Sequence, residues 1–174
     1  MKKRIDYILL GVSVLLGILT LILMVAPGVT LYDKQPNSVY YSVYYVMFNF
    51  GKNLKNALGG LVVAFAFTIA ALAVSLFLCL LKLLGKKINI APMISFVATA
   101  LTTTAGILFF CTRAMVFNSY KNMVLSADYY YYYKLGAGAV LCGVFSVLNA
   151  ATLCLYGFTF FNKRSESLEV PVRL

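Results

Sequence analysis

Few side chains in this sequence could do catalytic chemistry, and their spacing does not group them into a catalytic set. Histidine is absent, and the five acidic residues are Asp6, Asp33, Asp128, Glu166 and Glu169. A serine or cysteine nucleophile needs a neighbouring base, and a metal ion needs clustered ligands. The sequence shows neither pattern, so it predicts a protein that is not an enzyme and holds no cofactor. An acid pair would form only if the fold brought Asp33 close to Asp128.

Tyrosine offers a different chemistry, the recognition of a partner through a large ring with a polar hydroxyl group. Of the 13 tyrosines, only Tyr7 and Tyr156 lie outside two segments that resemble loops. The candidate partner-binding residues are Tyr40, Tyr41, Tyr44, Tyr45, Phe48, Tyr129, Tyr130, Tyr131, Tyr132 and Tyr133. An aromatic belt at the membrane surface is the alternative, and it suits residues 129–133 better than the earlier run. The earlier run could also pack over the end of the helices.

Polar residues inside apolar runs form a second group of candidates. The candidate interhelical polar residues are Thr99, Thr102, Arg113 and Asn149. Asn149 stands in the middle of a run and needs a hydrogen-bond partner on another helix, whereas Thr102 can instead bond the carbonyl one turn back. Arg113 is expected to reach the lipid headgroups, with a pair to Asp128 or a ligand site as alternatives. Asp6 is expected to cap the first helix, where negative charge suits the helix dipole.

The composition places these residues in a membrane protein. Hydrophobic residues make up 62% of the chain and charged residues 11%, against about 45–50% and about 25% in soluble domains. The net charge of +10 comes from cations that stand where the apolar runs end, which indicates anchoring in a membrane and not nucleic-acid binding. The predicted partners are therefore the lipid bilayer and either a membrane protein or a second copy of this chain.

Four apolar runs are long enough to cross a bilayer, which takes about 20 residues as a helix. The predicted fold class is all-α, an integral membrane four-helix bundle in one domain over residues 1–174. The predicted spans are about 5–26, 57–81, 90–115 and 135–161, with outer loops at about 27–56 and 116–134 and a tail at 162–174. Small residues recur every three or four positions in these spans, a pattern that lets helices approach closely in lipid.

The first loop holds an aromatic run at residues 38–50 that should form an element, because long loops without structure are uncommon. On a helix, the five aromatic candidates from Tyr40 to Phe48 share one face. This phasing predicts a short helix that lies at the membrane interface. Valine and tyrosine also favour strands, so a strand pair is the alternative.

Lysine and arginine are more numerous at one end of the predicted spans than at the other. The richer end carries Lys2, Lys3, Arg4, Lys82, Lys86, Lys87, Lys163, Arg164 and Arg173. The positive-inside rule therefore places both termini in the cytoplasm and both tyrosine-rich loops outside. The cysteines, Cys79, Cys111, Cys142 and Cys154, are expected to be buried thiols, with a bridge such as Cys111–Cys142 as the alternative. Loops without disulfides suit a bacterial cytoplasmic membrane.

The order of these elements resembles the four-span plan of the claudin family: a long first outer loop, a short inner turn, a shorter second outer loop and a short tail. The resemblance covers the layout of the whole chain and no motif. The tryptophan-rich, paired-cysteine first loop of that family has no counterpart here, because the chain contains no tryptophan and no cysteine between Pro27 and Asn56. No functional residue is carried over.

These observations predict a non-enzymatic multi-pass membrane protein, an accessory or interaction subunit that contacts a partner through its tyrosine-rich loops. The alternative is a small transporter or channel component. A polar path for it would be lined by Ser95, Thr99, Thr102 and Asn149, with Thr103 beside them. Such a path would lack the carboxylates that cation-coupled transporters commonly use.

Overall fold

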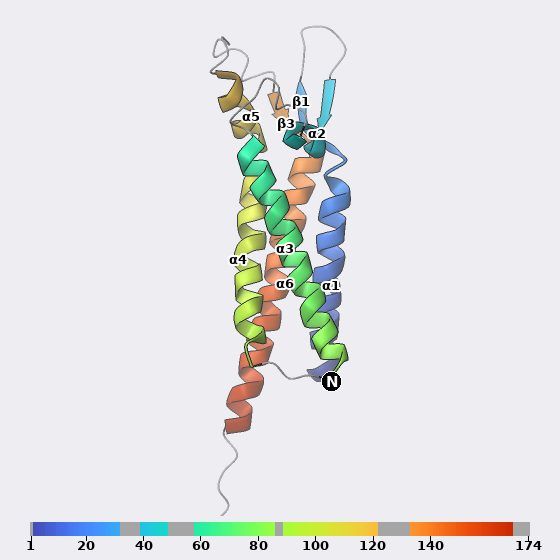
Figure 1. Cartoon of the computed structure of the whole chain (residues 1–174), viewed down its shortest axis with the longest axis vertical. Helices are drawn as coiled ribbons and strands as arrows, with labels where there is room; N and C mark the ends of the chain where they lie inside the picture. The colour runs from blue at the N-terminus through green and yellow to red at the C-terminus, as the bar shows by residue number, and fades with distance from the viewer. Residues whose placement is uncertain (1, 32–38, 49–57, 86–88, 122–132, 169–174) are drawn as a thin grey trace, which may run out of the picture.

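The computed structural model describes residues 2–31, 39–48, 58–85, 89–121 and 133–168. Four long helices lie side by side as a bundle (Figure 1). They are α1 (Lys2–Leu23), α3 (Leu58–Leu83), α4 (Ala91–Phe110) and α6 (Ala137–Leu168). Each contains a stretch long and apolar enough to cross a membrane: Ile5–Leu23, Gly59–Leu83, Ala91–Phe110 and Ala137–Thr159. The prediction of a mainly helical chain with four membrane-length helices is confirmed.

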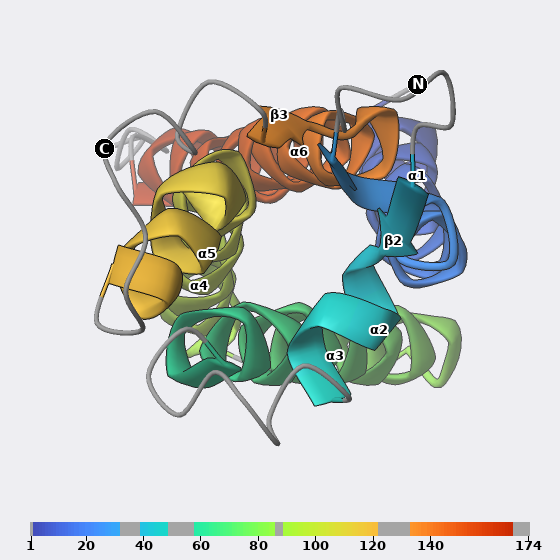
Figure 2. The ribbon, with the colours of Figure 1, turned by 90° about the horizontal axis from the view of Figure 1, so that it is seen from above.

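The helices follow one another around a ring in the order α1, α3, α4, α6, so that α1 and α4 lie at opposite corners (Figure 2). Small residues let neighbouring helices come close. A Cβ atom built on Gly106 of α4 would lie 3.3 Å from the carbonyl oxygen of Gly143 on α6. Gly85, with φ of 70°, ends α3, because glycine adopts this left-handed conformation without steric cost.

A small cap covers one end of the bundle. It consists of β1 (Pro27–Leu31), β2 (Val39–Ser42), β3 (Tyr133–Leu135) and the short helix α2 (Val43–Phe48). The strands form an antiparallel sheet in the order β2-β1-β3, with Val29 opposite both Tyr41 and Leu135. The sheet therefore joins segments from the two predicted loops, which are distant in the sequence.

The main apolar core lies where the cap meets the helices. Its buried residues include Met24, Val43, Met47, Leu61 and Phe109, which come from four different segments of the chain. The start of α6 lies directly against β1: the backbone N–H of Gly136 donates to the Gly28 carbonyl at 2.8 Å. A Cβ on Gly138 would lie only 2.6 Å from the Ala26 carbonyl oxygen, so this contact requires glycine.

The aromatic run does not form the single helix that its phasing predicts. Its first part, Val39–Ser42, is strand β2, and only Val43–Phe48 is helical. Hydrogen bonding to β1 explains the strand, since it adds to the β-propensity of valine and tyrosine. Ser42 then starts α2, because its Oγ accepts the N–H of Tyr45 at 3.1 Å, which is a helix N-cap.

Two other predicted boundaries also differ. The sequence predicts an unbroken third span to residue 115, but α4 ends at Phe110 and a separate helix, α5 (Thr112–Lys121), follows. The Thr112 hydroxyl donates to the Phe109 carbonyl at 2.7 Å, a local bond that competes with the helical ladder. In addition, α6 continues to Leu168, into the predicted tail, because no glycine or proline stands between Gly157 and Pro171.

Candidate functional site

Three aromatic side chains project from the cap, and they are called the cap aromatic surface here: Tyr40, Tyr45 and Phe48. They are 63%, 43% and 56% exposed. Tyr41 is partly buried and stacks on Tyr45, with ring centroids 5.4 Å apart. The strand-to-helix transition at Ser42 therefore separates Tyr40 and Tyr41 from the helical face that the sequence assigned to them, yet keeps the aromatic rings together.

Tyr44 differs from its neighbours because it fastens the cap to the bundle. Its hydroxyl donates to the Leu21 carbonyl in the last turn of α1 at 3.2 Å. Its ring meets Phe65 of α3 edge-on, with centroids 6.0 Å apart. Burial raises the pKa of the Tyr44 hydroxyl above its ordinary value of 10.0, with the Cys142 thiol as a smaller cause. Tyr44 is thus a packing residue and not part of the exposed surface.

Most of the second tyrosine run cannot be placed. Tyr129, Tyr130, Tyr131 and Tyr132 lie outside the described residues, as does Asp128 and with it the suggested pair with Arg113. Tyr133 is the first residue of β3, and its backbone pairs with Leu31. Arg113 is half-buried on α5.

Inside the bundle, polar residues recur every seven positions on three helices, and they are called the polar seam here. The residues are Asp6, Ser13 and Thr20 on α1, Thr68, Ser75 and Lys82 on α3, and Cys142, Asn149 and Tyr156 on α6. A seven-residue repeat keeps one face of a helix toward its neighbours. Because α1 and α3 are antiparallel, the repeat sets these residues opposite one another at three levels, about 10.5 Å apart along the axis.

The middle level is a closed hydrogen-bonded group. The Ser13 hydroxyl donates to Asn149 Oδ1 at 2.5 Å, and Ser13 Oγ lies 2.8 Å from Ser75 Oγ. Ser13 has one proton to donate, so the Ser75 hydroxyl either donates to Ser13 or to the Ala71 carbonyl 2.9 Å away. Asn149 is only 2% exposed. Hydrogen bonds among Ser13, Ser75 and Asn149 thus join three helices at this level.

The threonines of α4 bond within their own helix instead. Thr99 donates to the Ser95 carbonyl at 2.9 Å and Thr102 to the Ala98 carbonyl at 3.0 Å. Ser95 reaches α6, where its hydroxyl donates to the Leu153 carbonyl at 2.5 Å. Thr103 lies on the exposed side of α4. The structure therefore does not bring Thr103 into a polar path with Asn149, and the seven-residue polar repeat runs along α1, α3 and α6.

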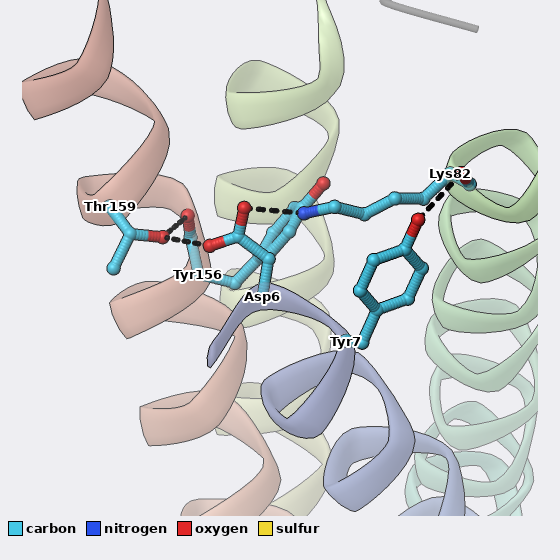
Figure 3. A network of polar contacts seen from close by, with 5 residues as sticks. All are labelled: Asp6, Tyr7, Lys82, Tyr156 and Thr159. Atoms are coloured by element: carbon cyan, nitrogen blue, oxygen red, sulfur yellow. Dashed lines mark hydrogen bonds and ion pairs between the residues drawn. The ribbon is translucent and has the colours of Figure 1, made fainter. Parts of the chain in front are cut away.

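The seam ends in an ionic cluster at the end of the bundle away from the cap (Figure 3). Lys82 Nζ lies 2.5 Å from Asp6 Oδ2, and the Thr159 hydroxyl donates to Asp6 Oδ1 at 3.3 Å. The lysine nitrogen is 5.3 Å from the centre of the Tyr7 ring and 5.1 Å from that of Tyr156. The Tyr7 hydroxyl donates to the Lys82 carbonyl at 3.0 Å.

The interpretation of Asp6 as a helix cap is wrong. Helix α1 already begins at Lys2, and no acidic residue lies in its first turn. Asp6 instead pairs across the bundle with Lys82, whose position at the end of an apolar run indicates only an anchor in the membrane. The missed signal was the seven-residue repeat: the step from Asp6 to Ser13 to Thr20 matches that from Lys82 to Ser75 to Thr68 in the antiparallel direction.

The four cysteines are free thiols, and Cys111 is exposed while Cys142 is buried. The expectation of burial is thus wrong for Cys111, which lies at the break between α4 and α5. Within residues 2–31, 39–48, 58–85, 89–121 and 133–168, no group of three or more His, Cys, Asp and Glu residues could hold a metal ion.

Comparisons of the chain with protein-family models, with curated proteins and with solved structures found no match.

Proposed function

We propose that this multi-pass membrane protein is a non-enzymatic accessory or interaction subunit, which contacts a membrane-protein partner or a second copy of itself through the cap aromatic surface. The observation that supports the proposal is the exposure of Tyr40, Tyr45 and Phe48 on one small cap. Rigid aromatic side chains supply large contact area with little loss of conformational entropy, and they dominate many interfaces.

The way in which the cap is attached to the helices favours a role of these rings in recognition over a simple aromatic belt. Strand β1 continues from α1, β3 leads into α6, and α2 contacts α3. The cap is therefore connected to three of the four long helices. A surface held in this way is preorganised, which lowers the entropic cost of binding a partner.

We further propose that the cap faces outward and that both termini are cytoplasmic, in a bacterial cytoplasmic membrane. Lys82 lies in the last turn of α3, and this end of α3 is opposite the cap (Figure 1), in agreement with the positive-inside rule. The claudin-like layout belongs to the same proposal. It is supported by a sheet that unites the two loop regions at one end, with only a short connection between α3 and α4 at the other.

Purification in a mild detergent, followed by mass measurement and identification of co-purifying proteins, tests the proposal. A Tyr40→Ala/Tyr45→Ala/Phe48→Ala variant should lose the partner and still unfold cooperatively. Phe77→Ala is the matched control, since Phe77 is 49% exposed but lies on α3 away from the cap. A lone monomer from the natural chain, or a complex that survives in the triple variant, would contradict the proposal.

The second candidate is a transporter or channel component, and the polar seam is the observation that favours it. The seam extends from the ionic cluster past Ser13 and Asn149 to Thr20 and Cys142. In this case Asn149→Ala would change a flux measured in liposomes, while the triple cap variant would leave it unchanged. Equal flux in the natural chain, in Asn149→Ala and in the triple cap variant would eliminate this candidate.

A further inference from the structure

The ionic cluster has a geometry that the proposed function does not use. The ammonium group of Lys82 is held by one carboxylate oxygen of Asp6 and lies over two aromatic rings, Tyr7 and Tyr156 (Figure 3). A carboxylate beside aromatic faces is the chemistry that binds organic ammonium ions, because the negative ring faces attract a cation that has shed its water. Lys82 is thus bound as an alkylammonium ligand would be.

The residues that surround the Lys82 ammonium group do not depend on the Lys82 side chain for their positions. The Tyr7 hydroxyl is bonded to the main-chain carbonyl of residue 82, which any residue would supply. Asp6 keeps a bond from the Thr159 hydroxyl through its other oxygen. Tyr156 is only 3% exposed and belongs to an apolar core cluster with Leu10. Removal of the lysine side chain should therefore leave the carboxylate and both rings in place.

The cluster is also accessible from outside the protein. The Lys82 side chain is 20% exposed, whereas that of Asp6 is 8% exposed. Tyr7 is 40% exposed. These residues lie at the ends of the apolar spans, which begin at Ile5 and end at Leu83 and Thr159. That position is the level of the lipid headgroups, where ammonium groups are abundant.

We propose that Asp6, Tyr7 and Tyr156 form a binding site for an alkylammonium group, which Lys82 occupies in this structure and which an amine from outside the chain occupies when Lys82 is withdrawn. The amine is either a free small molecule or the headgroup of an aminophospholipid. A tethered ligand competes at a millimolar or higher effective concentration, so Lys82 excludes dilute amines from the unmodified protein. This inference does not depend on the cap or its partner.

Ethylammonium chloride is the probe, and the thermal unfolding of Lys82→Ala in mild detergent is the measurement. At ten times its Kd, the amine should raise the ratio of folded to unfolded protein about elevenfold, a rise in Tm of about 3–6 °C. The unmodified protein should show no such rise, because its own lysine fills the site. Sodium chloride at the same concentration controls for ionic strength.

Two variants make the comparison specific. Asp6→Asn/Lys82→Ala lacks the carboxylate and should not respond to ethylammonium. Lys134→Ala removes an exposed lysine on β3, far from the cluster along the bundle, and should behave as the unmodified protein. A response of Lys82→Ala no larger than that of these two proteins would overturn the proposal.

Lipid nanodiscs distinguish the two sources of the amine. If Lys82→Ala is stabilised by phosphatidylethanolamine relative to phosphatidylglycerol, and the double variant is not, the site takes a lipid headgroup. If only free ethylammonium stabilises it, the site takes a soluble amine.

If the Lys82→Ala variant does not fold, the Lys82→Gln variant replaces it. If neither folds, recovery of folded protein by purification in ethylammonium supports the site, and failure to recover it overturns the proposal.

Discussion

At the scale of single residues, the same residue type has different roles according to its neighbours. Tyr44 and Tyr45 are adjacent, yet Tyr44 bonds to the end of α1 while Tyr45 belongs to the exposed surface. Helical geometry explains the difference, because consecutive residues on a helix point about 100° apart. Aromatic content alone therefore does not distinguish exposed tyrosines from packing tyrosines.

Tyr44→Phe tests the bond to α1. At pH 8 the variant should be less stable by about 0.5–1.5 kcal/mol, the usual net value of one hydrogen bond. Because the pKa of Tyr44 is raised in the folded protein from 10.0, its contribution is fully present below pH about 10 and is lost as the pH rises further. Thermal unfolding between pH 8 and 11 should show a steeper loss of stability in the natural chain than in Tyr44→Phe. Parallel profiles would contradict this assignment.

Asn149→Ala tests the middle level of the seam. Interhelical hydrogen bonds in membranes contribute about 0.6–1.7 kcal/mol, and the variant should lose about that much in detergent unfolding. Thr103→Ala is the control, because its hydroxyl bonds only its own helix on the exposed side. If Ser13→Ala and Asn149→Ala are coupled, the double variant should lose less than the sum of the single losses. Additive losses would mean that these side chains do not interact.

At the scale of elements, the cap is built at the junctions of β1 with its neighbours. Gly136 and Gly138 let the first turn of α6 lie directly on the backbone of residues 26–28. The sheet then brings β3 beside β1, although more than 100 residues separate them in the chain. Close backbone packing at one point thus determines how the second loop region joins the first.

Gly138→Ala should weaken this junction. The new Cβ would meet the Ala26 carbonyl at 2.6 Å, and such overpacking costs about 1–3 kcal/mol. Gly11→Ala is the matched control, because no atom lies within 4 Å of a Cβ built there, and alanine favours a helix over glycine. Unfolding should show a lower Tm for Gly138→Ala and an equal or higher Tm for Gly11→Ala. Equal Tm values for all three proteins would contradict the close contact.

At the scale of the whole molecule, the two ends of the bundle differ in chemistry. One end carries a sheet and exposed aromatic rings, and the other carries the Asp6–Lys82 cluster. The three levels of the polar seam lie between these ends, in the interior of the bundle.

Labelling with a membrane-impermeant maleimide tests the proposed orientation. In a background with the four native cysteines replaced by serine or alanine, Tyr40→Cys should be labelled in intact cells. Leu84→Cys, at the opposite end and 69% exposed, should be labelled only after the membrane is opened. The reverse pattern would place the cap in the cytoplasm.

The sequence by itself determined that the chain is mainly helical with four membrane-length helices. The length of an apolar run is a local property, and it need only match the thickness of the bilayer. The sequence also located the aromatic run and the mid-span Asn149. Only the tertiary structure decided that residues 39–42 are a strand, since the stabilising hydrogen bonds come from β1. Likewise, the pairing of Asp6 with Lys82 depends on α1 lying antiparallel to α3. Each of these outcomes is set by a neighbour distant in the sequence, so the pattern within one segment is not enough. The seven-residue repeats of α1 and α3 match Asp6 with Lys82 only when the two helices are compared as antiparallel neighbours.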